Sequence, residues 1–138
     1  MIRNVTYNNP QIERELNAAV GKAYGLMQRL KLRGTGSPKL LVVEASEHFG
    51  EYLSATNDLN YCQLELRPEG LLLRFRYLLE TMAWVLPMDA LEWTHRPARL
   101  TLKSGDAWMV LEPVGRDEGS TVAFLRKCER EWRAGIGG

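Results

Sequence analysis

This sequence has no long hydrophobic run and very little cysteine. Its longest apolar runs, Met82–Leu86 and Ala107–Leu111, are five residues each, whereas a helix that spans a bilayer needs about 20. The first residues contain no apolar core of a signal peptide, so we expect neither a secretory signal nor a transmembrane segment. With only 2 cysteines, the expected setting is the cytoplasm, where both remain free thiols.

The sequence also lacks an excess of either charge, because 18 basic and 17 acidic residues leave a formal net charge of +1. This balance is not that of a polybasic protein, so no nucleic-acid partner is predicted. No internal repeat or low-complexity segment is visible. A chain of 138 residues with 45% hydrophobic residues can form its own core, and we predict one domain over residues 1–138.

Residues 10–33 carry a helical pattern. Asn9 is a good residue to begin a helix, and Gly34 is a good residue to end one. We interpret Gly21 and Gly25, four positions apart, as a place where a strand passes close beneath the helix. Apolar residues recur three and four positions apart along the predicted buried face, which consists of Ile12, Leu16, Ala19, Val20, Ala23, Met27 and Leu30.

Two independent signals predict a β-hairpin after Tyr61. Apolar and polar residues alternate along Tyr61–Arg67, as in a strand with one buried face. Pro68 and Gly70 then occupy the positions that a type I turn favours. The turn and the alternation give the same register, with the buried pairs Leu66 and Leu71, Leu64 and Leu73, and Cys62 and Phe75.

Other short strands are predicted at 40–44, 81–86, 91–95, 99–103 and 107–112, and a closing helix at 119–134. Strands that are joined by hairpins and flanked by helices indicate an α+β fold. We therefore predict a strongly curved antiparallel sheet, or a barrel, of about seven strands over residues 39–113, with an N-terminal and a C-terminal helix.

The hairpin also carries a resemblance. Glu65–Gly70 and Leu79–Pro87 resemble an uncharacterised family of small bacterial proteins with an E-L-R-P-x-G hairpin and an L-E-x-x-x-W-V-[IL]-P strand. More distantly, the strand order over 61–132 is similar to that of bacterial PH-like domains, which implies a PH-like barrel. Arg74–Arg76 matches the R-x-R of phosphoinositide-binding members, although the turn before it is tighter than their first loop.

Two pairs of residues are candidates for binding. Arg74 and Arg76 lie on outward strand positions and are candidate contacts for an anionic ligand or a lipid headgroup; the alternative is an ordinary surface of mixed charge. Trp84 and Trp108 lie on alternating strands, and at least one of them is a candidate for a protein interface. The alternative for the tryptophans is that they fill a wide barrel mouth.

Residues 44–51 contain a candidate metal site. On a helix, Glu44, Glu47, His48 and Glu51 would share one face and offer oxygen and nitrogen ligands to a divalent cation. However, Leu40–Val43 predicts a strand, and at a strand end followed by a turn these side chains would point apart. The sequence favours the turn.

Neither cysteine is a predicted nucleophile, because Cys62 and Cys128 fall on inward faces.

We predict no catalytic residue and no cofactor. The function predicted first is a non-enzymatic protein-interaction domain of PH-like type, with a homodimer as one form of that interaction. The alternatives are a module that binds a small anionic ligand or a lipid, and a metal-dependent enzyme that uses Glu44, Glu47, His48 and Glu51.

Overall fold

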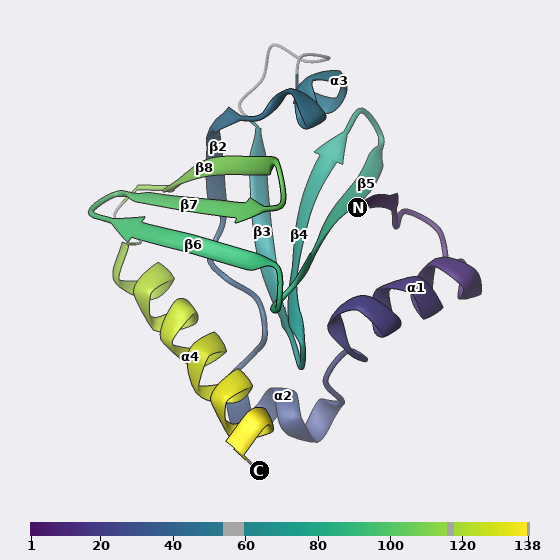
Figure 1. The fold of residues 1–138 in the computed structure, drawn as a ribbon, viewed down its shortest axis with the longest axis vertical. Coiled ribbons are helices and arrows are strands. Elements are labelled where there is room, and N and C mark those ends of the chain that lie inside the picture. Colours follow the sequence, from purple (N-terminus) through teal and green to yellow (C-terminus); the bar gives the residue numbers. More distant parts are fainter. Residues whose placement is uncertain (54–59, 116–117, 138) are drawn as a thin grey trace.

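The computed structural model describes residues 1–53, 60–115 and 118–137 (Figure 1). These residues form an α+β fold with one antiparallel sheet. Its strands are β1 (Ile2–Asn4), β2 (Leu40–Ala45), β3 (Tyr61–Arg67), β4 (Gly70–Tyr77), β5 (Glu80–Pro87), β6 (Leu91–Arg96), β7 (Arg99–Ser104) and β8 (Ala107–Pro113). Its helices are α1 (Pro10–Val20), α2 (Leu26–Leu32), α3 (Gly50–Leu53) and α4 (Glu118–Gly137), with a 3-10 turn at Glu47–Phe49.

The sheet is curved but open. Its strand order is β1-β5-β4-β3-β2-β8-β7-β6, so β1 and β6 are its two edges. β2 joins the two halves, and its pairing with β8 shifts register between Val42 and Glu44, an irregularity that bends a strand. Beyond β2, the strands β6–β8 run across β3 and β4 (Figure 1). The expectation of an α+β fold with an antiparallel sheet is therefore confirmed, whereas the alternative of a closed barrel is wrong.

The β3–β4 hairpin has the predicted register. Cys62 pairs with Phe75, Leu64 with Leu73, and Leu66 with Leu71, and all six side chains are buried. The end of the hairpin approaches β5 closely: a Cβ on Gly70 would lie 2.3 Å from the carbonyl oxygen of Leu86. Only glycine allows this approach of the hairpin to β5.

The concave face of the sheet holds the core. Side chains from β2–β5, β7 and β8 meet there, and Phe124, Leu125 and Cys128 of α4 pack against them. Phe49 fills part of the same core and contacts Trp84 edge to face, with ring centroids 4.8 Å apart. The core is thus made by one face of the bent sheet together with one face of the C-terminal helix.

The N-terminal helix differs from the prediction over 10–33, because the chain leaves the helix after Val20. Gly21 has a φ of 86°, and a Cβ there would meet Pro68 at 3.0 Å. The Glu69 amide donates to the Val20 carbonyl at 2.8 Å. The β3–β4 turn therefore satisfies the end of α1, and the chain begins again as α2.

The structure also contains a strand that the sequence did not indicate. β1 pairs with β5, with Arg3 opposite Ala83, and brings the count to eight strands in the described residues. α1 covers one end of the outer, convex face of the sheet, where Leu16 and Val20 pack on Leu72 and Val85. Within the described residues, the other end of that face is open to solvent.

Candidate functional site

The open end of the outer face contains a hollow of about 290 Å³ that we call the basic hollow. Arg74 and Arg76, the predicted ligand contacts, both line it. Strand alternation puts them there, because the residue between them, Phe75, points into the core. The complete lining is Lys39, Tyr61, Cys62, Gln63, Arg74, Phe75, Arg76 and Thr81.

Strand pairing assembles this lining from three parts of the chain. Gln63 lies opposite Arg74 across β3 and β4, and Thr81 lies opposite Arg76 across β4 and β5. The Gln63 side chain is held by a hydrogen bond from its Nε2 to the Ser37 carbonyl, at 2.8 Å. The sequence pointed to the two arginines but not to the residues that face them.

The three cations of the basic hollow are held in different ways. Lys39 Nζ lies 4.6 Å from the centroid of the Tyr61 ring, a cation–π contact that fixes it at the rim. Arg74 forms an ion pair with Glu65. Arg76 is exposed and has no hydrogen-bond or ion-pair partner within the described residues. An anion that entered the hollow would therefore meet in Arg76 a cation that no described acidic group neutralises.

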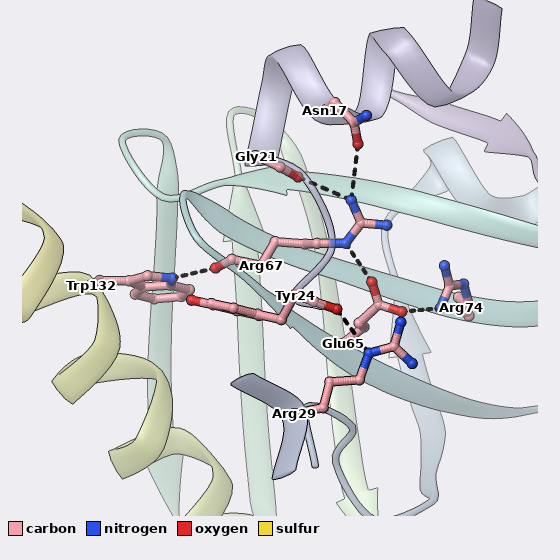
Figure 2. Close-up of polar contacts among 8 residues, drawn as sticks. All are labelled: Asn17, Gly21, Tyr24, Arg29, Glu65, Arg67, Arg74 and Trp132. Carbon is pink, nitrogen blue, oxygen red and sulfur yellow. Dashed lines mark hydrogen bonds and ion pairs between the residues drawn. The ribbon is translucent and has the colours of Figure 1, made fainter. Parts of the chain in front are cut away.

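Glu65 and Arg67 hold Arg74 in place (Figure 2). Arg67 is 6% exposed and donates to the Asn17 side chain at 3.3 Å and to the Gly21 carbonyl at 3.0 Å. It also pairs with Glu65, whose second oxygen accepts from Arg74. We call these residues, Asn17, Gly21, Glu65, Arg67 and Arg74, the Arg67 cluster.

The Arg67 cluster keeps Glu65 ionised. Burial acts to raise the pKa of this carboxyl, but the hydrogen bond from Arg67 and the positive charges of Arg74 and Arg67 outweigh it, and the pKa is below its usual value. The cluster also joins α1, β3 and β4 to α4, since Trp132 Nε1 of α4 donates to the Arg67 carbonyl at 2.9 Å. Its role is structural, and Arg74 is the member that extends into the hollow.

The two candidate interface tryptophans lie in different environments. Trp84 is 1% exposed and lies in the core against Phe49, so it presents no surface to a partner, which corrects the expectation for this residue. Trp108 is half-buried on β8, and its backbone amide donates to the Ser46 hydroxyl at 3.1 Å. Of the two candidates, Trp108 is the one with surface to offer.

The candidate metal residues do not converge. Glu44 lies in β2, Glu47 and His48 lie in the 3-10 turn, and Glu51 lies in α3, all exposed. His48 Nδ1 is 2.9 Å from the Ser46 hydroxyl. No three histidine, cysteine or acidic side chains are grouped as metal ligands within residues 1–53, 60–115 and 118–137.

Both cysteines are buried and free. Burial raises the pKa of Cys62 to about 12 and that of Cys128 to about 12. At neutral pH these thiols are protonated, and a protonated thiol is a poor nucleophile.

Exposed apolar side chains form the surface feature that sequence reasoning missed. Leu26, Met27 and Leu30 of α2 are 73%, 70% and 67% exposed, although the helical pattern placed Met27 and Leu30 on a buried face. Leu78 and Leu79 also lie in solvent, in the two-residue turn between β4 and β5. A sequence signal for the exposure of α2 was the pair of glycines before it, which allow the helix to end early.

Comparison with known proteins identifies no relative: no family model, no curated protein and no solved structure matches this chain. In the part of the chain that the structure describes, no helix is both long and apolar enough to cross a membrane.

Proposed function

We propose that this protein is a non-enzymatic protein-interaction domain whose basic hollow receives an acidic side chain of a partner protein. The observation that carries the proposal is Arg76, an exposed guanidinium with no ion-pair partner among the described residues, in a hollow that Lys39 and Arg74 also line. Guanidinium groups bind carboxylates through paired, charge-assisted hydrogen bonds. The Glu65 carboxylate already pairs with Arg67 and Arg74, so it competes only weakly with a partner's carboxylate for Arg76.

The shape of the hollow supports a side chain as its occupant. Pockets for small organic ligands commonly enclose about 300–1,000 Å³ and bury most of the ligand, and this one measures about 290 Å³ on the open surface of a sheet. The Tyr61 side chain gives it an apolar wall beside the cations. A carboxylate on a short aliphatic stem suits both surfaces.

The PH-like assignment remains part of this proposal. A curved antiparallel sheet with a C-terminal helix against its concave face supports it. The strand β1 and the helices α1 and α2 precede that unit, so the likeness would concern residues after β2. Pairing of two copies is a second form of the interaction, and light scattering over a range of protein concentrations tests it: a mass that stays at 15.7 kDa removes it.

A glutamate-rich peptide, compared with the same peptide carrying glutamines, tests the hollow by calorimetric titration. We expect binding of the glutamate peptide to weaken at least about fivefold in Arg76→Gln, because the free cation is removed. Arg96→Gln is the matched control, since Arg96 is an exposed arginine on the distant strand β6. Equal binding by both variants and the wild type would show that the hollow is not the contact.

A small anionic ligand is the second candidate, favoured by the convergence of Arg74, Arg76 and Gln63 on one hollow. Inorganic phosphate and citrate, added to a thermal unfolding assay, distinguish it from the first. A rise in Tm that Arg76→Gln abolishes supports a free anion, whereas no rise beside clear peptide binding supports the protein partner.

A further inference from the structure

We propose that α2 docks onto an anionic lipid surface through its exposed apolar face. Leu26, Met27 and Leu30 are each at least two-thirds exposed, and in α2 only Leu32 packs against the core. The helix lies at one end of the molecule, between α1 and the C-terminal end of α4 (Figure 1). A flat surface can therefore reach it without contact with the sheet.

The order of residues in α2 is that of an interfacial helix. At about 100° per residue, Leu26, Leu30 and Met27 fall within an arc of about 100°. Arg29 lies beyond one side of this arc and Lys31 beyond the other. Long cationic side chains at the borders of an apolar face can reach lipid phosphates while the apolar side chains enter the acyl region.

Charge complementarity identifies the chemistry of the partner. The chain as a whole has a net charge of +1, yet residues 16–43 contain five basic residues and no acidic one. All five are exposed, namely Lys22, Arg29, Lys31, Arg33 and Lys39. Arg29 and Lys31 lie in α2, and Lys22 and Arg33 lie close to it in the chain, whereas Lys39 lines the basic hollow. Anionic lipids attract the four cations in and beside α2, and the attraction adds to the burial of the apolar side chains.

A second copy of the chain fits this face poorly. A symmetric dimer places the same patch of both copies in contact, so one interface would hold Arg29 and Lys31 of both copies, and residues 16–43 supply no acid to pair with them. A protein helix is also disfavoured, because α2 does not line the basic hollow and its apolar side chains are exposed rather than recessed. A lipid surface requires no groove.

Sedimentation with vesicles tests the proposal. We expect the wild-type protein to bind vesicles of phosphatidylcholine mixed with phosphatidylglycerol, and to bind pure phosphatidylcholine at least about tenfold more weakly. Two variants separate the contributions: L26S/M27S/L30S removes the apolar face and R29Q/K31Q removes two flanking charges. Each should weaken binding to the mixed vesicles at least about tenfold.

L78S/L79S is the matched control, because these leucines are equally apolar and exposed but lie at the other end of β4. It should bind as the wild type does. Circular dichroism confirms that each variant is folded. The proposal is overturned if the wild type binds no anionic vesicles, if the α2 variants bind as the wild type does, or if L78S/L79S loses binding as they do.

Discussion

α1 and α2 are consecutive helices with similar apolar content, but they have opposite environments. α1 buries Leu16 and Val20 on Leu72 and Val85 of the sheet. α2 leaves Leu26 and Leu30 in solvent. An apolar stripe therefore packs only where the rest of the fold supplies an apolar surface, and here that surface ends with the β3–β4 turn.

The buried face of α1 contributes to folding, whereas the exposed face of α2 is available for binding. Burial of α1 removes apolar surface from water and stabilises the fold. Leu26, Met27 and Leu30 of α2 contribute little to the free energy of folding, because they are largely exposed in the folded protein as well. Substitutions on the two helices, and at the junction that separates them, should have effects of very different size.

The largest effect is expected at Gly70, where the hairpin supports the end of α1. In Gly70→Ala the new methyl group would lie 2.3 Å from the Leu86 carbonyl oxygen and 2.8 Å from Val20 Cγ1. We expect a loss of at least about 3 kcal/mol in the free energy of unfolding, because a backbone atom must move. Urea unfolding measures it, with Gly105→Ala, an open-turn glycine at φ 61°, as the comparison. Equal stability of the wild type and G70A would contradict the close approach.

The second-largest loss of stability is expected at Arg67, because it connects the junction between α1 and α2 to the sheet. Arg67→Ala leaves Glu65 with Arg74 alone and removes the donor to the Gly21 carbonyl. A loss of about 3 kcal/mol is expected for breaking a buried ion pair of this kind. The Arg74 side chain is half-exposed, so Arg74→Ala should cost only about 1 kcal/mol. A larger loss in Arg74→Ala than in Arg67→Ala would show that Arg67 does not hold the Arg67 cluster together.

On α1 itself, Leu16→Ala should cost about 2 kcal/mol, since it creates a cavity against Leu72 and Val85. Chemical denaturation measures this directly. Ala18→Ser, on the exposed side of α1, provides the control, and a similar loss in both variants would mean that α1 does not pack on the sheet as described.

The pH dependence of stability tests the ionisation of Glu65. Its pKa is lowered in the folded protein, so its contribution is complete above the usual glutamate pKa of about 4.3 and is lost as the pH falls through the folded value. Glu65→Gln should therefore show a flatter decrease in unfolding free energy at acid pH than the wild type. An unchanged slope would mean that the carboxylate gains nothing from its arginines.

Local patterns predicted the β3–β4 hairpin because the turn and the alternation that define it lie within one short segment. The break after Val20 was not predictable in this way, since it depends on Pro68 and Glu69 docking from a distant part of the chain. β1 was missed for the same reason, as its three residues are stabilised only by pairing with β5.

The candidate site was predictable in part. Arg74 and Arg76 follow from strand alternation, whereas Lys39 joins them only through the pairing of β2 with β3. Trp84 was ambiguous because β5 is covered on both faces, by the core on one and by α1 on the other, so its residues from Ala83 to Leu86 are all buried. A strand buried on both faces carries no alternation from which to assign a side.

The free energy of unfolding of L26S/M27S/L30S tests most directly the claim that α2 serves binding and α1 serves folding. If the three side chains lie in solvent, urea unfolding of this variant should give a free energy within about 1 kcal/mol of the wild-type value, a difference that the lower helix propensity of serine accounts for. A loss of more than about 2 kcal/mol would show that these side chains are buried in the folded protein, and would contradict both the environment assigned to α2 and the lipid contact proposed for it.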